Sequence, residues 1–425
     1  MKILAVGDMH LGRTPSRLPP DLSARELGPA EAWGRTVATA IDEGVAAVLL
    51  AGDLVDRDDD FFEAYRELEA GVRRLADTGI EVIGVAGNHD LKVLPRLVEH
   101  IPDFRMLGAG GSWESHAIEG SEAVTVWGWS FPAAGAAGNP LQDWAFEPGT
   151  GINLGLLHCD RDAGADSRYA PVASAELRHA GLDGWLLGHI HKPDKLTAPS
   201  PSGYLGSLTG LDRGEPGPRG PWLITVAGGR LTEVEHLQLA PLRWETLDVD
   251  LDGIGEPAEA RDRLLAAVRA LDARLATLPL PPAAAGLSVR FTGRTGLGDA
   301  AVKEIAEEDR NHLYSGSAGT RYFIPTPPLA DTRPEVDLEE LAQRRDPVGL
   351  LAQRLLWLDR PAGDPDRDRL LAEARRRLRN QAARSAWRGL AGEGDPDPDR
   401  WLRQAGFRAL DRLLAQQRPG EQDNG

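Results

Sequence analysis

The chain has 425 residues, a formal net charge of −17 and a single cysteine, Cys159. A chain of this length predicts about two or three domains with a sizeable core, and its composition excludes a fibrous or largely disordered protein. The lone cysteine excludes an internal disulfide and a zinc site built from thiolates. The acidic balance excludes nucleic-acid binding through an overall positive charge.

No apolar run approaches the length of a membrane span, and no signal-peptide pattern precedes the first expected strand. Together with the absence of cysteine pairs, this predicts a cytoplasmic protein with no membrane partner. Only five of the 48 basic residues are lysines. Arginine suits bidentate contacts with phosphate, although a coding bias across the genome explains the excess equally well.

Five short apolar runs share one sequence pattern: each is followed directly by residues that can bind a metal ion. Runs of this length, bounded by glycine, are typical of buried strands. The runs and the residues that follow them are Ile3–Val6 with Asp8 and His10, Val45–Ala51 with Asp53 and Asp56, Val82–Ala86 with Asn88, His89 and Asp90, Ile152–Leu157 with His158, and Trp185–Leu187 with His189 and His191.

The segments between these runs predict an α/β domain over residues 1–240. Helices are expected over Glu31–Glu43 and Phe61–Asp77. After Gly110, short β segments alternate with glycine and proline turns, which predicts a mixed sheet or two stacked sheets. These later β segments are Val124–Trp129, Leu223–Val226 and Leu231–Leu239.

A small α/β domain is predicted over residues 241–330, with the element order β-α-β-α-β. Its first helix, Pro257–Leu278, carries leucine and valine at alternating spacings of four and three, which forms one apolar face. The other expected elements are strands at Trp244–Leu251, Leu287–Phe291 and Thr320–Ile324 and a second helix at Asp299–Glu308.

A helical region is predicted over residues 331–425, after a proline-rich connector at Pro325–Pro334. Helices are expected over Val336–Leu358, Asp366–Leu390 and Arg400–Gln417, and the polar tail from Pro419 is expected to be disordered. The middle helix has eight arginines against three acidic residues. A solvated helix face is the simpler interpretation of this stripe, and a surface for a partner or a phosphate is the alternative.

Residues that leave the carboxyl ends of neighbouring strands converge on one crevice, so the five polar groups predict a pocket for more than one metal ion. Two divalent ions about 3.5–4 Å apart can generate a nucleophile and neutralise charge at phosphorus. Such a pair needs a bridging carboxylate and a mixture of ligand types. Asp8 and His10 can reach one ion, Asp53 is the expected bridge, Asn88 offers a neutral oxygen, and His158, His189 and His191 complete the two spheres.

His89 is left over, because the two ions have enough ligands without it. We expect this histidine to protonate the leaving oxygen or to stabilise the charge that develops on the phosphate. Asp56 can orient His89 and favour its protonated form. Asp90 is expected to act behind the ligands or in a turn.

The five motifs have the sequences GDMHLG, GDLVDR, GNHD, LLHCD and GHIH in chain order. With them, residues 1 to about 192 resemble the calcineurin-like metallophosphoesterases. The resemblance implies a four-layer αββα sandwich and two divalent ions, customarily Mn²⁺. It implies that metal-bound hydroxide attacks phosphorus while His89, with Asp56 as its companion, assists the leaving group. The implied ligands are Asp8, His10, Asp53 and His191 for one ion, and Asp53, Asn88, His158 and His189 for the other.

Within that family, the chain looks most like the bacterial SbcD and YhaO type of DNA repair exonuclease. The likeness rests on the glycine-rich segment from Gly206 to Gly220, on a cap-like unit after Trp244, and on the sequence DPVGLL from Asp346 to Leu351. It implies a DNA exonuclease or endonuclease whose helical region docks an SMC-like coiled-coil ATPase of the SbcC or YhaN kind, and which can form a homodimer. The alternative is a metallophosphoesterase that acts on a small nucleotide or a phosphoprotein.

Two features depart from that type. Asp58, Asp59 and Asp60 follow the second motif, and they would repel a DNA backbone if they faced the crevice. Thr209 stands where the YhaO type tends to carry glutamine. Neither departure affects an expected metal ligand. Three or more histidine ligands disfavour magnesium, but the residues leave manganese, iron and zinc open.

Overall fold

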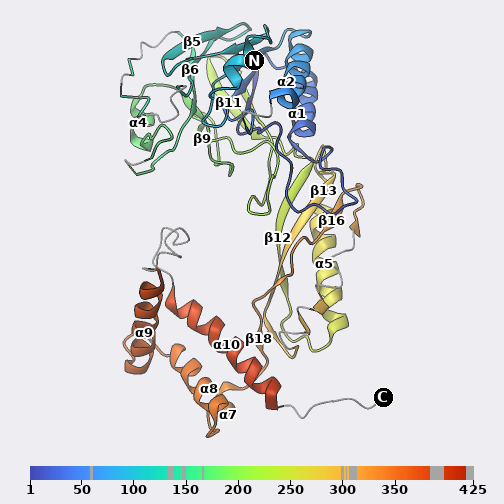
Figure 1. Ribbon diagram of the computed structural model, residues 1–425, viewed down its shortest axis with the longest axis vertical. Coiled ribbons are helices and arrows are strands. Elements are labelled where there is room, and N and C mark those ends of the chain that lie inside the picture. The colour runs from blue at the N-terminus through green and yellow to red at the C-terminus, as the bar shows by residue number, and fades with distance from the viewer. Residues whose placement is uncertain are drawn as a thin grey trace. The chain divides into compact units, whose positions relative to one another are not determined.

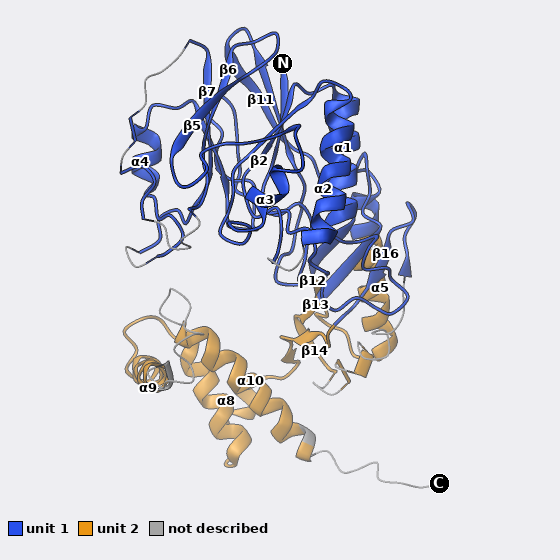
Figure 2. Ribbon diagram, turned by 45° about the horizontal axis from the view of Figure 1, so that its top comes forward, with its two compact units in different colours: residues 1–246, 271–288, 313–325 blue, residues 247–270, 289–312, 326–425 orange. Residues whose placement is uncertain are grey.

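The computed structural model describes residues 1–57, 61–132, 138–142, 144–145, 150–164, 167–297, 301–302, 304–305, 314–382 and 397–417. The chain forms two compact units, which Figure 2 distinguishes by colour. Unit 1 comprises residues 1–246, 271–288 and 313–325, and unit 2 comprises residues 247–270, 289–312 and 326–425. The division into three domains at residues 240 and 330 stays a prediction.

Unit 1 contains a six-stranded sheet with the order β11-β10-β1-β2-β3-β4, whose edge strand β11 is labelled in Figure 1. Strands β1 to β4 are parallel, and β10 pairs antiparallel with β1 and β11. The strands are β1 (Lys2–Val6), β2 (Ala47–Leu50), β3 (Glu81–Gly84), β4 (Phe104–Met106), β10 (Trp222–Ala227) and β11 (Arg230–His236). The first three apolar runs are therefore neighbouring parallel strands, and their carboxyl ends meet at one edge.

A second sheet of five strands, in the order β5-β6-β7-β8-β9, packs on the first. Its strands are β5 (Trp113–Ile118), β6 (Val124–Trp129), β7 (Ile152–His158), β8 (Gly184–Gly188) and β9 (Ser202–Tyr204). Ile3, Leu49 and Ile83 of the first sheet share a core with Val126 and Leu156 of the second. Because the central strands β1, β2 and β7 are covered on both faces, they are buried and largely apolar along nearly their whole length. The expectation of stacked sheets is confirmed.

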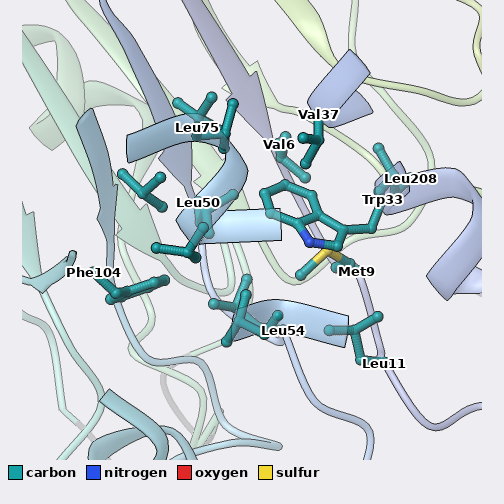
Figure 3. Close-up of a cluster of buried hydrophobic side chains, with 14 of the residues drawn as sticks. Val6, Met9, Leu11, Trp33, Val37, Leu50, Leu54, Leu75, Phe104 and Leu208 are labelled. Atoms are coloured by element: carbon teal, nitrogen blue, oxygen red, sulfur yellow. The ribbon is translucent and has the colours of Figure 1, made fainter. Parts of the chain in front are cut away.

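Helices cover the other face of the six-stranded sheet. They are α1 (Pro29–Glu43), α2 (Phe61–Ala76) and α3 (Leu94–Val98). Proline suits the first turn of α1, and Gly44 ends the helix with a φ of 59° in the left-handed region. Figure 3 shows Trp33 of α1 in the core beneath these helices, beside Met9 and Val37. Trp33 Nε1 donates a hydrogen bond of 3.1 Å to the carbonyl of Glu67 in α2.

Helix α4 (Ser174–His179) covers the outer face of the second sheet, where Leu177 and Trp185 share a core with Cys159. The layers are thus helices, sheet, sheet and helix, as expected for an αββα sandwich. Burial also raises the pKa of the Cys159 thiol, so this residue stays protonated and serves as a small core side chain.

Strands β12 (Leu242–Asp250) and β13 (Ala284–Thr292) and helix α5 (Pro257–Leu275) each have residues in both units. Strand β13 pairs in parallel with β16 (Arg321–Phe323) and with β17 (Leu329–Ala330). The predicted apolar face is buried at Leu264, Val268, Leu271 and Leu275, but the helix ends at Leu275 and does not reach Leu278 as expected. The remaining short strands are β14 (Arg294–Thr295), β15 (Tyr314–Ser315) and β18 (Arg333–Pro334). Most of the helix expected at Asp299–Glu308 lies outside the described residues.

The C-terminal part of unit 2 is helical. Its helices are α7 (Leu338–Leu341), α8 (Pro347–Leu358), α9 (Pro365–Ala382) and α10 (Pro398–Gln417), with a core that contains Val348, Leu355, Leu371 and Leu410. The expected single helix over Val336–Leu358 was wrong. Asp346 caps α8 by accepting a hydrogen bond of 2.9 Å from the Gly349 N–H, and Pro347 begins that helix. A residue before proline is disfavoured in a helix, so the chain breaks at this point.

Residues 383–396, which include the rest of the arginine-rich helix expected to reach Leu390, lie outside the described part of the chain, as does the polar tail from Pro419. Among the described helices, none is long and apolar enough to cross a lipid bilayer.

Candidate metal centre

The candidate metal ligands meet at one edge of the two stacked sheets, because they follow parallel strands. Four of them, Asp8, His10, Asp53 and His189, have positive φ angles of 29°, 51°, 51° and 105°. Such conformations cost a non-glycine residue about 1–2 kcal/mol. The turns at the strand ends therefore hold these side chains in place at the expense of local strain, which is a common feature of functional sites.

A first cluster consists of Asp8, His10 and His191, whose ligand atoms all lie within 4.8 Å of one another. His10 Nε2 and His191 Nε2 are 2.9 Å apart. His191 Nδ1 is 2.6 Å from Glu215 Oε1, and an ionised carboxylate only accepts hydrogen bonds. Nδ1 therefore carries the proton, and the neutral ring presents the lone pair of Nε2 to the cluster.

A second cluster consists of Asp53, His158 and His189, with the amide oxygen of Asn88 beside the two histidines. His158 Nδ1 donates a hydrogen bond of 3.0 Å to the carbonyl of Ala51, so Nε2 of the neutral ring carries only a lone pair. This Nε2 is 3.0 Å from Asn88 Oδ1 and 3.4 Å from Asp53 Oδ2. Three acceptor atoms thus face one another, which is repulsive unless a cation or a proton lies between them.

The Asp53 carboxylate lies between the two clusters. Its Oδ2 is 4.0 Å from His10 Nε2 and 3.4 Å from His158 Nε2. Its Oδ1 accepts a hydrogen bond of 2.9 Å from the backbone N–H of His89. This is the position of a carboxylate that can contact ions in both clusters.

Asp8 provides an independent test of whether these residues suit a cation. Its Oδ1 accepts a hydrogen bond of 2.8 Å from the backbone N–H of His189. Its Oδ2 is buried and has no hydrogen-bond partner within the described ranges. A buried carboxylate oxygen without a donor is costly, and a divalent cation supplies the missing positive charge. The set of imidazole, carboxylate and amide ligands fits manganese, iron or zinc.

The electrostatic environment favours the metal-binding protonation states of Asp53 and His189. Burial raises the pKa of Asp53, but the adjacent His158 and His10 outweigh this effect and hold the pKa below its usual range. Burial and the neighbouring His158 lower the pKa of His189, which favours the neutral imidazole. The site therefore offers an ionised Asp53 carboxylate and a neutral His189 ring, which are the forms in which these two residues bind a metal.

His89 lies exposed at the rim of the centre, with its ring 5.1 Å from that of His10. The structure differs from expectation in the atom of Asp56 that holds this histidine. His89 Nδ1 is 2.9 Å from the backbone carbonyl oxygen of Asp56, not bonded to its carboxylate. The carboxylate oxygen Oδ1 instead lies 3.1 Å from His10 Nδ1.

The pairing of two turns explains this difference. The segment after β1 and the segment after β2 are bridged at Leu11 and Val55, and the backbone N–H of Asp56 donates to the carbonyl of Leu11 at 3.1 Å. This pairing directs the Asp56 carboxylate toward His10. Contact with His10 is also the main reason why the pKa of Asp56 is lowered.

Asp90 lies in the turn after β3, where it is completely buried behind the candidate ligands. Its carboxylate accepts hydrogen bonds of 2.7 Å from the Gly87 N–H and 2.6 Å from the Leu54 N–H. It thereby joins the turns after β2 and β3. Burial, together with the negative charge of Asp53, raises the pKa of Asp90 to about 7.

Glu215 was not identified as a site residue from the sequence. Its Oε1 contacts His191, and its Oε2 accepts a hydrogen bond of 3.0 Å from the Leu211 N–H. The available signal was an acidic residue within the glycine-rich segment from Gly206 to Gly220, downstream of the last histidine pair.

Residues 1–193 match the family described as "Calcineurin-like phosphoesterase". The "Uncharacterized metallophosphoesterase YhaO" of Bacillus subtilis is 30% identical over 217 residues, which are 50% of this chain and 53% of that protein. This chain thus matches about half the length of that relative. The "DNA double-strand break repair protein Mre11" of Aeropyrum pernix is 26% identical over 289 residues, or 63% of this chain and 69% of that protein. Its namesake from Halobacterium salinarum is 26% identical over 411 residues, or 88% and 91%.

Proposed function

We propose that the protein is a metal-dependent phosphodiesterase that cleaves DNA, because residues 1–193 match the calcineurin-like phosphoesterase family. The observation that carries this proposal is the convergence of acceptor atoms in the second cluster. His158 Nε2 lies 3.0 Å from Asn88 Oδ1 and 3.4 Å from Asp53 Oδ2, and in the neutral form of the ring all three atoms are acceptors. Such an arrangement is stable with a cation at its centre.

We assign two cations to the two clusters, with manganese as the expected metal. When bound, two such ions activate water as a nucleophile and neutralise charge on the phosphate. Asp53 is the bridging residue, since it lies between the clusters. The other assigned ligands are Asp8, His10 and His191 for the first ion, and Asn88, His158 and His189 for the second.

His89 is the residue that we assign to the leaving oxygen. Its backbone N–H donates to Asp53 and its Nδ1 is bound to the Asp56 carbonyl, so both its main chain and its ring are oriented by the turn after β2. With Nδ1 engaged, Nε2 is the atom that delivers a proton or a positive charge to the substrate. The Asp56 carboxylate supports this arrangement through His10 rather than through His89.

The relatives support DNA as the substrate. Two of them are named for the repair of DNA double-strand breaks, and one of these matches extends over 88% of this chain. Thr209 does not weaken the proposal, because it is buried and its hydroxyl donates a hydrogen bond of 3.5 Å to the Leu242 carbonyl. Asp58, Asp59 and Asp60 lie outside the described residues.

A coiled-coil ATPase is the partner that we propose for the helical region at residues 331–425. In the described part of this region, the large side chains Leu350 of α8 and Trp401 of α10 are 59% and 58% exposed. We assign these two side chains to the interface with the ATPase. Deletion of residues 331–425 should leave hydrolysis of a small ester intact and abolish binding to the purified ATPase. Binding that survives the deletion would place the docking site elsewhere.

Metal analysis combined with a cleavage assay tests the function directly. Purified protein should bind two manganese ions, and it should cleave linear single-stranded or double-stranded DNA as well as bis(p-nitrophenyl) phosphate. A chelator should abolish both activities, and manganese should restore them. Hydrolysis of the chromogenic ester without DNA cleavage would favour the alternative, a phosphoesterase for small nucleotides or phosphoproteins.

A further inference from the structure

Helix α10 and strand β18, which lie side by side in Figure 1, border a pocket of about 480 Å³ in unit 2. Its wall consists of residues around the short strands β14 and β18 together with residues from the first half of α10. A volume of this size is typical of sites that hold a small-molecule ligand. Five arginines and four aspartates line the pocket, so its wall is net positive within a chain whose formal net charge is −17.

Two of these arginines are neighbours on paired strands. Strands β14 and β18 run parallel, and their register places Arg294 directly opposite Arg333. Like charges at opposite positions of paired strands repel each other. Among the residues that the structure describes, neither guanidinium group forms an ion pair with a carboxylate. The strands therefore hold two positive charges together at the pocket without a counter-charge from the described chain.

The guanidinium group of Arg333 also contacts an aromatic ring of α10. Its Cζ lies over the ring of Phe407, at 5.2 Å from the ring centroid. This cation–π contact holds the side chain in place. The N–H groups of a guanidinium lie in its plane, so they can donate hydrogen bonds to a ligand while the flat face stays on the ring.

A third arginine of the pocket, Arg400, lies in the first turn of α10, which begins at Pro398. The N-terminus of a helix carries the positive end of the helix dipole, so a cation is disfavoured at this position. Arg400 is exposed, and within the described ranges it too forms no ion pair. An anion in the pocket would offset the unfavourable placement of all three arginines.

The four aspartates of the pocket are engaged by other donors. They contribute to the structure of the wall and not to ion pairs with the three arginines. Two of them accept hydrogen bonds from backbone N–H groups, and two accept them from side chains of α10. These bonds run to Asp252 from the Arg294 N–H at 2.9 Å, to Asp397 from the Arg400 N–H at 3.4 Å, to Asp331 from Gln404 Nε2 at 2.7 Å, and to Asp399 from Arg403 Nε at 2.8 Å.

We propose that this pocket binds a phosphorylated small molecule, whose phosphate group accepts hydrogen bonds from Arg294, Arg333 and Arg400. A guanidinium group can donate two parallel hydrogen bonds to a phosphate, which makes arginine well suited to such groups. A phosphate monoester also carries about two negative charges at pH 7, so it offsets a cluster of arginines better than a single carboxylate does. A bound phosphate would link β14 and β18 to α10, and binding should therefore stabilise unit 2. The site does not depend on the chemistry of the metal centre.

Isothermal titration calorimetry of the full-length manganese-loaded protein tests the pocket with adenosine 5′-monophosphate (AMP), inorganic phosphate and adenosine. AMP should bind at least as tightly as inorganic phosphate, whereas adenosine, which has no phosphate group, should not bind. The titrations should be repeated after chelation of the metal, because a phosphate can also bind at a metal centre. Binding in the pocket should persist with unchanged affinity.

Arginine variants locate the binding. Arg294→Gln and Arg333→Gln should each weaken AMP binding about tenfold, because each removes a charge-assisted contact. Arg376→Gln, which removes an exposed arginine of α9 outside the pocket, is the matched control and should bind AMP like the wild type. All three variants should keep the wild-type kcat and KM for bis(p-nitrophenyl) phosphate. Arg294→Gln should also leave the unfolding temperature of the free protein unchanged or raise it, because it relieves the repulsion between the strands.

Four results would overturn the inference. AMP binding that is weakened equally by Arg376→Gln and Arg294→Gln would show only a general attraction between charges. Binding that disappears on chelation would place the phosphate at the metal centre. Loss of oligonucleotide binding in Arg294→Gln, without any binding of AMP, would assign the arginines to nucleic acid. Binding of inorganic phosphate without AMP, or no binding of either anion at about 10 mM, would leave no such ligand site in the pocket. Hydrolysis of bis(p-nitrophenyl) phosphate by the wild type reports separately on the proposed phosphodiesterase.

Discussion

The carboxylate of Glu215 lies 2.6 Å from Nδ1 of His191, and this contact decides which nitrogen of the histidine faces the first cluster. The other nitrogen, Nε2, is 2.9 Å from Nε2 of His10. A carboxylate behind a metal-binding histidine fixes the ring and increases the basicity of the ligating nitrogen. Glu215 is itself held by the Leu211 N–H, so the glycine-rich segment before β10 is coupled to the centre.

We expect Glu215→Gln to weaken manganese binding about 10- to 100-fold, the usual effect of removing such a supporting residue. The amide no longer stabilises a positive charge on His191, and its NH₂ group can face Nδ1 and favour the wrong tautomer. Competition with a fluorescent chelator measures the affinity. Glu119→Gln, a change at an exposed position, is the matched control and should bind metal like the wild type. Equal affinities in the two variants would remove Glu215 from the site.

The same pair should contribute to stability in a defined pH range when metal is absent. Burial lowers the pKa of His191, but Glu215 and Asp8 outweigh burial and raise the pKa above 6.5. The stability that His191 contributes is therefore fully present below pH 6.5, and it is lost as pH rises through the folded-state pKa. Burial raises the pKa of Glu215, but the contact with His191 outweighs burial and lowers the pKa below 4.5. The stability that Glu215 contributes is therefore present above pH 4.5, and it is lost as pH falls through the folded-state pKa. The pair should therefore stabilise most between about pH 4.5 and 6.5.

Urea unfolding of the chelator-treated protein tests this dependence. The difference in free energy of unfolding between wild type and Glu215→Gln should be larger at about pH 5.5 than at about pH 8.5, by roughly 1 kcal/mol. A difference that is constant over this range would contradict the assignment of the ion pair.

His89→Ala should keep the metal content of the wild type and lower kcat by about two orders of magnitude or more, the scale expected for general acid catalysis. The His89 side chain is exposed, and its Nδ1 contacts the backbone carbonyl of Asp56. Its removal therefore leaves the assigned ligands in place. Steady-state kinetics and mass spectrometry of bound metal measure the two effects. His100→Ala, at an exposed position outside the centre, serves as the control. Unchanged turnover would exclude His89 from the mechanism.

Asp53→Ala should reduce bound manganese toward one ion or none. Its carboxylate lies between the clusters, so its loss removes a ligand from both and leaves their histidines with less negative charge to hold a cation. Metal content after gel filtration gives the stoichiometry, and Asp42→Ala on the exposed face of α1 is the matched control. A variant that still carried two ions would contradict the bridging role.

Two glycines in neighbouring helices should respond in opposite ways to alanine. A Cβ at Gly71 of α2 would lie 2.1 Å from Trp33 Nε1, so Gly71→Ala must displace a buried indole and should cost about 1–3 kcal/mol. A Cβ at Gly34 of α1 meets nothing within 4 Å, so Gly34→Ala should stabilise the protein by about 0.5–1 kcal/mol through helix propensity. Thermal and urea unfolding measure both changes. A neutral Gly71→Ala would mean that Trp33 is less tightly held than its contacts indicate.

Much of the fold was predictable because its signals are local. An apolar run such as Ile3–Val6 and the ligand candidates Asp8 and His10 lie within a few residues of one another, so the strand and its functional turn are visible together. The same holds for helix α5, whose three- and four-residue spacing defines the buried face. The break before α8 also has a local signal in the sequence, the Asp346–Pro347 pair.

The partners of the side chains depended on contacts between distant segments. The pairing of Leu11 with Val55 turns the Asp56 carboxylate to His10 and leaves only its backbone carbonyl for His89. In the same way, the tertiary fold brings Glu215 next to His191 and Tyr169 next to His189. A hydrogen bond requires an atom placed within a few tenths of an ångström, and only the packed sheets and their loops bring distant segments to that distance. Residue types and spacing thus indicate which groups gather at the centre, while the packing selects the atoms that meet.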